Sequence, residues 1–368
     1  AAAGDTVSVT VGGKSYTATV GSDLKWSVTI PSADLQAFGD GDLTFSASVT
    51  NAHGNTGTGE RDININAELP GLRVNTISGD DVINAIEQQQ DLAVTGSSTH
   101  LAEGTQITVT INNVEYVTTV NASGSWQIGV PAADLQAWTA GGMTVSVSAE
   151  DAWGNTVAAE HPIELDLNAV AVTIDTVTTD DMLNAAEKGA DVTLSGQTQG
   201  VEAGQTVVVK FADQTFTAQV QQDGSWHLTV PASAMETLID GRAQVSVSVT
   251  NVNGNSADAS RVVIVDTQPP AITLDNLTDD NIINAAEAQQ DLVLSGSTTA
   301  ETGQTVTVTL NGKSYQTTVQ ADGRWQLNVP AADVGALTDG NVTVTATVSD
   351  VAGNSSSADR VGLVDATV

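Results

Sequence analysis

Residues 305–319 read "TVTVTLNGKSYQTTV", in which two runs of alternating apolar and polar residues flank an Asn-Gly pair. A period of two is typical of a β-strand with one buried face, because successive side chains point to opposite faces of the sheet. An Asn-Gly pair between two such runs favours a type I′ turn, in which both central residues take a positive φ. The stretch is therefore predicted to form a β-hairpin.

The hairpin belongs to a unit that repeats about every hundred residues along the chain. A tryptophan marks each unit, and the spacings between Trp26, Trp126, Trp226 and Trp325 are 100, 100 and 99 residues. A Gly-Asn pair follows late in each unit, as in "NVNGN" and "DVAGN". Such periodicity identifies a tandem array. We name its members copy one (1–68), copy two (69–167), copy three (168–267) and copy four (268–368).

Copy four shows the strand pattern most clearly. We expect strands at 271–275, 291–297, 305–310, 313–319, 324–329, 342–349 and 359–365. A short helix is expected at 330–337, where a proline begins a segment without alternation. Seven short strands in about a hundred residues indicate an immunoglobulin-like sandwich. The predicted fold is therefore all-β, a tandem array of seven-stranded immunoglobulin-like β-sandwiches that forms an elongated rod, with the repeated tryptophans in the cores.

Copy one departs from this pattern at its start. Its first residue aligns with about residue 300 of copy four. We therefore expect copy one to lack the first two strands of the sandwich and the loop that joins them.

The chain is strongly acidic, with 11 Lys and Arg against 44 Asp and Glu and a formal net charge of −33. This charge disfavours binding to nucleic acid or to an anionic membrane surface. No apolar run approaches the length of about 18 residues that membrane insertion needs. Cysteine is absent, so stability must come from packing, repetition or metal rather than from disulfides.

An acidic loop recurs in copies two, three and four, as "GDDVINAIEQQQD" (79–91), "TDDMLNAAEKGAD" (179–191) and "DDNIINAAEAQQD" (279–291). Clustered Asp, Asn and Glu side chains suit Ca²⁺, which takes six to eight oxygen ligands. The spacing is not that of an EF-hand. The alternative is a solvated loop in which Asn-Ala-Ala-Glu forms one capped helical turn. The candidate ligands in the three loops are Asp80, Asp81, Asn84, Glu87, Asp180, Asp181, Asn184, Glu187, Asp280, Asn281 and Glu287.

Strand directions predict where these loops lie. In an antiparallel sandwich of seven strands, the acidic loop and the end of the last strand share one pole, and the loop before the last strand lies at the opposite pole. Three acidic elements are then expected to meet at each junction between copies. For copies three and four they are Asp180, Asp181, Glu187 and Asp266 with Asp350 and Asn354. For copies two and three they are Asp80, Asp81, Glu87 and Asp166 with Asn251 and Asn255.

Asp151 and Asp365 hold equivalent positions elsewhere in the array and are also candidate calcium ligands. Short linkers with several carboxylates should bend when empty, because like charges repel, and straighten when a divalent ion neutralises them. We therefore expect bound Ca²⁺ to stiffen the chain.

Two further tryptophans, Trp138 and Trp153, occur in copy two alone, in segments that read as loops. Exposed aromatic rings could stack on glycans, or they could be incidental or contact a neighbouring domain. Paired carboxylates could also serve a glycosidase, but here they repeat in successive copies. The histidines fall at no common position in the copies, and no nucleophile motif is present. The chain is therefore not expected to be an enzyme.

The phrases "DDxINAAE", "LSGxT", "GxWxLxVP" and "DxxGN" together resemble the bacterial immunoglobulin-like repeats of giant type I-secreted adhesins, over the whole chain. The resemblance implies a monomeric segment of a non-fimbrial adhesin that is secreted and retained at the bacterial surface. It implies calcium near domain junctions, export in the unfolded state through the type I secretion machinery, and a distal tip that binds a glycan or glycoprotein receptor on a host cell surface. No C-terminal secretion signal is recognisable, so we expect an interior or subterminal segment.

Overall fold

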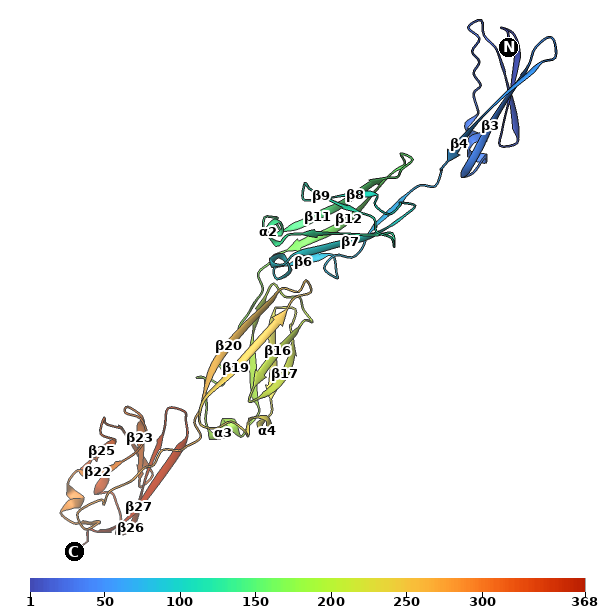
Figure 1. The fold of residues 1–368 in the computed structure, drawn as a ribbon. Coiled ribbons are helices and arrows are strands. Elements are labelled where there is room, and N and C mark those ends of the chain that lie inside the picture. Colours follow the sequence, from blue (N-terminus) through green and yellow to red (C-terminus); the bar gives the residue numbers. More distant parts are fainter. Residues whose placement is uncertain (368) are drawn as a thin grey trace. The chain divides into compact units, whose positions relative to one another are not determined.

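A computed structural model describes residues 1–367. Contacts between residues divide this part of the chain into two compact units, Ala1–Leu167 and residues 168 onward. Each unit contains two copies, and each copy is built almost entirely from β-strands (Figure 1). Four separate hydrophobic cores are present in the described residues, and each draws its side chains from one copy.

Copy two is a sandwich of two sheets. The smaller sheet has the order β10-β7-β5, from β10 (Ser125–Val130), β7 (Leu92–Thr99) and β5 (Gly71–Val74). The larger has the order β6-β12-β11-β8-β9, from β6 (Val82–Asn84), β12 (Thr156–Asp166), β11 (Gly141–Glu150), β8 (Gln106–Ile111) and β9 (Val114–Thr119). The 3-10 helix η1 (Glu87–Gln89) and the helix α2 (Ala132–Leu135) lie between strands.

Copy three repeats this arrangement. Its smaller sheet has the order β13-β15-β18, from β13 (Ala171–Val172), β15 (Val192–Gln199) and β18 (Ser225–Val230). Its larger sheet has the order β14-β20-β19-β16-β17, from β14 (Met182–Leu183), β20 (Ser256–Val265), β19 (Gly241–Thr250), β16 (Thr206–Phe211) and β17 (Gln214–Gln219). The helices are α3 (Ala185–Lys188) and α4 (Ala232–Met235).

Copy four pairs β22 (Leu292–Ser297) with β25 (Arg324–Val329) in one sheet. The other sheet has the order β21-β27-β26-β23-β24, from β21 (Ile282–Asn284), β27 (Ser355–Asp365), β26 (Gly340–Ser349), β23 (Thr305–Leu310) and β24 (Lys313–Thr318). The helical segments are η2 (Glu287–Gln289) and α5 (Ala331–Val334).

The predicted hairpin in copy four is confirmed. Strands β23 and β24 flank Asn311 and Gly312, whose φ angles are 50° and 74° as a type I′ turn requires. Six of the seven predicted strands are present, and the one expected at 271–275 is reduced to a single bridge between Ile272 and Thr298. The immunoglobulin-like sandwich predicted from the alternation is therefore the observed architecture.

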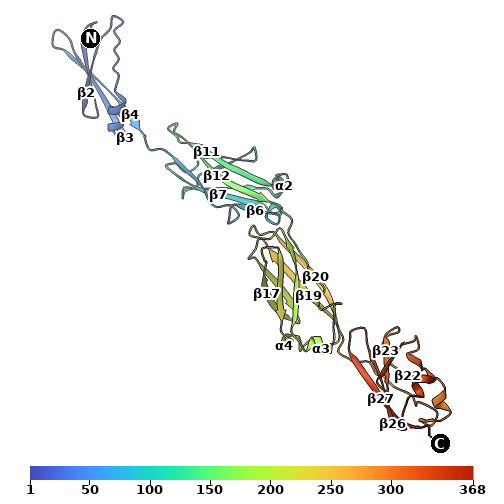
Figure 2. The same ribbon diagram turned by 180° about the vertical axis from the view of Figure 1, so that it is seen from behind.

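One strand in each of copies two, three and four was not predicted. The acidic loop contains β6, β14 or β21, and each pairs in parallel with the last strand of its own copy. Figure 2 shows β6 beside β12 in copy two. These strands have only two or three residues, too few for an alternating pattern to stand out. The pairing fixes the acidic loop to the edge of the larger sheet.

The repeated tryptophans of copies two, three and four lie in the cores as predicted. Trp126, Trp226 and Trp325 are 2%, 0% and 1% exposed. Each ring lies over a glycine of the facing strand, and a Cβ added to Gly96 would come within 2.2 Å of the Trp126 ring. Only glycine therefore leaves room for the buried indole.

Copy one has a single four-stranded sheet with the order β2-β1-β3-β4. Its elements are β1 (Thr6–Val11), β2 (Lys14–Thr19), α1 (Ser32–Ala37), β3 (Gly41–Thr50) and β4 (Thr56–Ile65). Trp26 is 43% exposed because no second sheet covers it. Among the described residues, Trp26 therefore differs from the buried tryptophans of copies two, three and four.

Candidate functional site

The acidic loop is held in shape by a capping box. In copy three the Asn184 side chain accepts hydrogen bonds from the backbone N–H groups of Ala186 and Glu187, both at 3.0 Å. The Glu187 carboxylate accepts in return from the N–H of Asn184 at 3.1 Å. Equivalent bonds occur around Asn84 and Asn284. The capped helical turn, considered above as the alternative to a metal site, is therefore present, and it uses one oxygen of each glutamate.

The first aspartate of each loop also bonds to the local backbone. Asp80, Asp180 and Asp280 each accept a hydrogen bond of 3.0 Å from the N–H two residues further on. In copy four this bond, with a second from Thr278, holds the pKa of Asp280 below its usual value. These three side chains are exposed to solvent.

The second aspartate turns into its own sandwich. In copy three Asp181 has a positive φ of 63°, and its two carboxylate oxygens accept from Arg261 Nε at 2.6 Å and Nη2 at 2.7 Å. The backbone N–H of Val177 donates a further bond of 2.9 Å. The bonds from Arg261 are the main reason that the pKa of Asp181 lies below its usual value.

Copy two has a histidine in place of this arginine. His161 Nε2 lies 2.7 Å from Asp81 Oδ1. Burial acts to raise the pKa of Asp81, but the bonds from His161 and from the N–H of Ile77 outweigh it and keep the pKa below its usual value. Copy four has an amide instead, and Asn281 donates to the carbonyl of Val361 at 2.7 Å.

Sequence reasoning placed Asp81 and Asp181 at domain junctions and did not predict these cationic partners. The signal was present, because His161 and Arg261 occupy inward-facing positions of the alternating last strand, where a charged residue needs a partner. Neither position was matched to the acid eighty residues earlier in its copy. In the structure, both carboxylates form bonds within their own sandwiches.

Within the second unit, the acidic loop of copy three meets the loop before the last strand of copy four, as the strand directions predicted. Asn354 Oδ1 accepts from the N–H of Ala185 at 2.9 Å, and Asn354 Nδ2 donates to the carbonyl of Asp266 at 2.9 Å. Asn184 Nδ2 donates to the carbonyl of Ala352 at 3.0 Å. These bonds join the two copies directly.

Three carboxylates lie at or beside this contact. Glu187 and Asp266 are partly buried and Asp350 is 7% exposed. Asp350 accepts from the backbone N–H and the side-chain amide of Asn354, at 2.8 and 3.0 Å. No ion pair to a lysine, arginine or histidine is found for any of the three within residues 1–367. In the part of the chain that the structure describes, none of these three carboxylates is therefore neutralised by an ion pair.

The described residues contain no group of three or more Asp, Glu, His or Cys side chains close enough to hold a metal ion. The donors near the contact are carboxylates, the Asn354 amide and backbone carbonyls. Such a set of hard oxygen donors fits Ca²⁺ and does not fit Zn²⁺, which favours nitrogen and sulfur.

Three other predicted ligands have structural partners in their own copies. Asp151 is 8% exposed and accepts from the N–H of Trp153 and from Asn155, each at 2.8 Å. Asp166 is 4% exposed and pairs in register with Asn84, and Asp365 pairs in the same way with Asn284. Asp166 and Asp365 thus end the last strand where the acidic loop is anchored.

The two additional tryptophans differ from each other. Trp138 is 5% exposed and belongs to the core of copy two, so its prediction as a glycan contact was wrong. It follows α2 and folds inward, where the other copies have Phe38, Leu238 and Leu337. An apolar residue at this position in every copy was the signal for burial. Trp153 is 57% exposed on the loop between β11 and β12.

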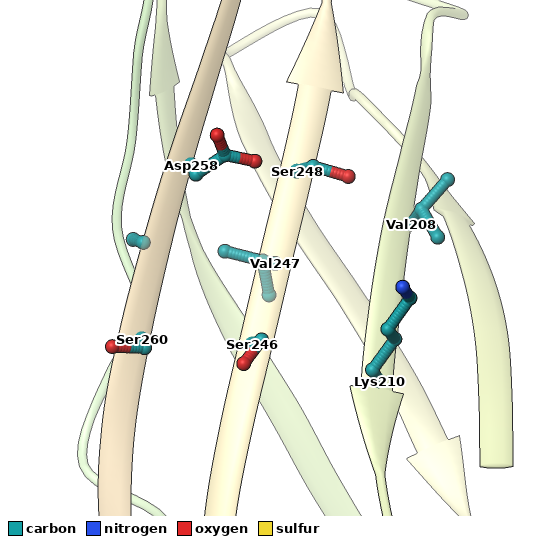
Figure 3. Close-up of a pocket in the computed structure, with 8 residues that line it drawn as sticks. Val208, Lys210, Ser246, Val247, Ser248, Asp258 and Ser260 are labelled. Carbon is teal, nitrogen blue, oxygen red and sulfur yellow. The ribbon is translucent and has the colours of Figure 1, made fainter.

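A hollow of about 430 Å³ lies open on the larger sheet of copy three (Figure 3). Small hydroxyl side chains line it, with Lys210 and Asp258 as its charged groups. Of the helices in the described residues, none is long and apolar enough to cross a membrane.

Comparison with known proteins gives one family match. Residues 270–365 match the family model described as a bacterial Ig-like domain. No curated protein sequence matches the chain. The family match indicates no catalytic family.

Three solved structures are similar to the chain over most of its length. A Ca²⁺-stabilized adhesin that helps an Antarctic bacterium reach out and bind ice shares 34% identity, covering 99% of this chain and 91% of its own, with a TM-score of 0.42. A 1.5-MDa bacterial ice-binding adhesin shares 30% identity, covering 81% of this chain and 98% of its own, with a TM-score of 0.43.

The third is a tetra-tandem repeat in the extending region of a large adhesion protein. It shares 29% identity, covering 100% of this chain and 93% of its own, with a TM-score of 0.39.

Proposed function

We propose that this chain, which belongs to the bacterial Ig-like domain family, is an extender segment of a large surface adhesin and that calcium stiffens it. One similar solved structure is a Ca²⁺-stabilized adhesin, and another comes from the extending region of a large adhesion protein. The extender would carry a binding tip away from the bacterium that secretes and retains it, toward a glycan or glycoprotein receptor on a host cell.

The further proposal that these are repeats of the kind in the giant adhesin of Salmonella is supported by the motif resemblance alone. Export through type I secretion machinery and a monomeric state belong to the same proposal.

The observation that carries the proposal is the contact between copies three and four. It is built from the acidic loop of one copy and a polar loop of the next, joined by bonds to Asn354. An extender needs such a joint, because successive copies must transmit force without a flexible linker. The direct bonds supply part of the stiffness in the absence of a metal.

Glu187, Asp266 and Asp350 are the carboxylates we propose to hold calcium at this joint, with Asn354 or backbone carbonyls completing the oxygen set. Partly buried carboxylates without a cation repel one another and are costly to desolvate. A bound divalent ion would remove that cost. Glu87 and Asp166 hold the equivalent positions in copy two, and the exposed Asp80, Asp180 and Asp280 are candidate outer ligands.

Calcium bound only to the folded state would also stabilise it, by RT ln(1 + [Ca²⁺]/Kd) per site. Extracellular modules bind calcium with dissociation constants of about 10⁻⁴ to 10⁻³ M. Sites of that affinity would fill outside a cell and stay empty in the cytosol, as unfolded export requires.

Small-angle scattering of the whole chain with calcium and with chelator tests the proposal. We expect a larger maximum dimension and a higher melting temperature in calcium, and no such change in magnesium. The double variant Asp266→Asn with Asp350→Asn should lose part of the response. Asp258→Asn is the matched control, because it removes a charge from the exposed sheet surface of the same copy as Asp266. Identical scattering curves with calcium and with chelator would refute the stiffening.

A second candidate function is glycan binding by the copies themselves. Trp153 favours it, because a large apolar ring that is 57% exposed has room to stack on a sugar. Binding of the chain on a glycan array would support this function if Trp153→Ala abolishes that binding and leaves the melting temperature unchanged. Equal binding by both proteins would exclude Trp153 as the contact.

A further inference from the structure

The chain leaves copy three at Thr267, and an aspartate holds this residue in place. Asp240 lies in the turn before β19, and its carboxylate accepts from the backbone N–H of Thr267 at 3.0 Å and from the Thr267 hydroxyl at 2.8 Å. The bond from the hydroxyl, followed by that from the N–H, keeps the pKa of Asp240 below its usual value. The preceding residue is Asp266, whose carbonyl accepts from Asn354 of copy four. Asp240 therefore fixes the backbone directly beside the contact between the two copies.

The same turn is also bonded to the acidic loop. Lys188, the last residue of α3, donates from Nζ to the carbonyl of Leu238 at 2.5 Å. Leu238 follows α4, and α3 lies beside α4 at one end of copy three (Figure 1, Figure 2). The first residue of α3 is Ala185, whose N–H donates to Asn354. Lys188 therefore connects the turn to the other group of copy three that Asn354 binds.

Together these bonds form a closed ring around the contact. The ring runs from Asn354 to Ala185, along α3 to Lys188, across to Leu238 and Asp240, and through Thr267 and Asp266 back to Asn354. The N–H of Ala185 and the carbonyl of Asp266 must hold a fixed separation, because a single amide binds both. A network in which each member has a partner is more rigid than its separate bonds.

We propose that Lys188 and Asp240 are positioning residues for the joint between copies three and four. They hold the Ala185 N–H and the Asp266 carbonyl at the separation that the Asn354 amide requires. Each acts through a group of its own copy, Lys188 through the Leu238 carbonyl and Asp240 through Thr267. The role concerns the direct contact and does not depend on calcium.

Two other copies repeat the bond that the aspartate makes. Asp40 accepts from the N–H of Ala67 at 2.7 Å, and Asp339 accepts from that of Ala366 at 2.8 Å. Each donor lies just beyond the last strand of its own copy. Copy two has Ala140 at this position, and alanine has no acceptor side chain.

The lysine differs between the copies with an acidic loop. Gln88 takes its position in copy two and donates to the carbonyl of Leu135 in α2 at 2.9 Å. Ala288 takes it in copy four and has no donor side chain. The structure therefore assigns the complete ring to copy three.

Hydrogen exchange tests each residue at the far side of the ring from the substitution. In chelator, exchange at the Ala185 N–H should rise about tenfold in Asp240→Ala, and exchange at the Thr267 N–H should rise about tenfold in Lys188→Met. In the structure, Ala185 N–H binds Asn354 and Thr267 N–H binds Asp240, so neither is bonded to the residue that its variant changes. Because calcium is absent, failure of the calcium proposal leaves this result unaffected.

The controls separate positioning from loss of a charge. Asp240→Asn keeps an acceptor oxygen and should exchange at Ala185 like the parent chain. Asp258→Ala removes an exposed carboxylate from β20 and should also leave this exchange unchanged. The double variant Lys188→Met with Asp240→Ala should lose no more protection than either single variant, because one break already opens the ring.

Spin labels measure the joint itself. The chain has no cysteine, so the exposed positions Thr217 and Thr318, replaced by cysteine, give one labelling site in each copy. Asp240→Ala should broaden the distribution of distances between the labels, and Asp240→Asn should not. An unchanged distribution, or exchange that rises only beside each substitution, would overturn the proposal. An equal rise at the N–H of Val209 in the core strand β16 would assign the effect to unfolding of copy three and would also overturn it.

Discussion

Copies two and three place the same acidic loop over the same last strand, but they bind its second aspartate with different basic side chains. Arg261 reaches both oxygens of Asp181, whereas His161 reaches one oxygen of Asp81. A guanidinium is charged at every accessible pH, while an imidazole carries charge only when protonated. The same acidic loop can therefore be held by side-chain bonds of different strength in neighbouring copies.

Removing the aspartate should have the largest effect on the stability of both copies. We expect Asp181→Ala to destabilise copy three by about 2–3 kcal/mol, because Arg261 loses its carboxylate and keeps only its bonds to Ile174 and Thr176, and the N–H of Val177 loses its acceptor. Asp81→Ala should cost copy two about 1–2 kcal/mol, because the carboxylate has one contact with His161 instead of the two that Arg261 makes with Asp181. Hydrogen exchange measured separately at 77–84 and 177–184 reports each copy. Equal losses would show that arginine and histidine fasten the loop equally.

Acid should reduce the stability of copies two and three at the second aspartate of the acidic loop, and should have no effect at the same position of copy four. The pKa values of Asp81 and Asp181 lie below the usual 3.8. A carboxyl with a lowered pKa in the folded state stabilises the protein above its unfolded pKa, and this stability is lost as the pH falls through the folded value. Copy four has Asn281 here, which does not titrate.

Exchange rates at 77–84, 177–184 and 277–284 between pH 5 and pH 2 check this prediction. The first two segments should open further than the third as the pH falls below about 4, because copy four lacks the second aspartate and responds only through Asp280, whose pKa is also lowered. The variant Asn281→Asp is the control, because it should increase the acid response of copy four. If all three segments open together, loss of the bonds to the second aspartate is not the cause of the acid response.

How much of this arrangement the sequence predicts depends on how local the cause is. Alternation and the Asn-Gly turn are local, and they predicted the sandwich and the hairpin of β23 and β24. Strand directions predicted the contact between the acidic loop of copy three and the loop that contains Asn354. The inward turn of Asp181 depends on a positive φ and on Arg261, eighty residues away in the chain, and no local pattern encodes it.

The same reasoning explains the error at Trp138. A tryptophan after a short helix reads as part of a loop, and only the position of the neighbouring strands shows that the ring returns to the core. Comparison with Leu238 and Leu337 would have corrected it. Equivalent positions in a tandem array therefore carry information about burial that a single copy lacks.

Exchanging the arginine and the histidine should change the stability of each copy by a smaller amount. His161→Arg should stabilise copy two by about 1 kcal/mol at pH 8, where the added guanidinium is charged and an imidazole in general is not. Slower exchange at 77–84 checks this, and Arg261→His should do the opposite at 177–184. A gain in copy two that is the same at pH 5 and pH 8 would contradict the charge argument.

The smallest expected effect lies at a second difference between the two copies, on the edge strands β9 and β17. Tyr116 donates to Asp134 at 2.9 Å, whereas copy three has Phe216 and no such bond. Burial first, and then the bond to Asp134, raise the pKa of Tyr116 to about 12. An acid whose folded pKa is raised adds stability below its unfolded pKa of 10.0, and loses it as the pH rises through about 12.

Tyr116→Phe should therefore reduce the stability of copy two by about 0.5–1 kcal/mol at pH 7. A spectrophotometric titration should also show one fewer phenol that remains protonated at pH 11. Tyr16 and Tyr315 make the matching bonds to Asp34 and Asp333, so Asp134→Asn isolates the effect to copy two. Ionisation of all three tyrosines near pH 10 would mean that the bonds do not persist in solution. Copy three, which has phenylalanine at this position, should keep the same exchange rates in every one of these variants.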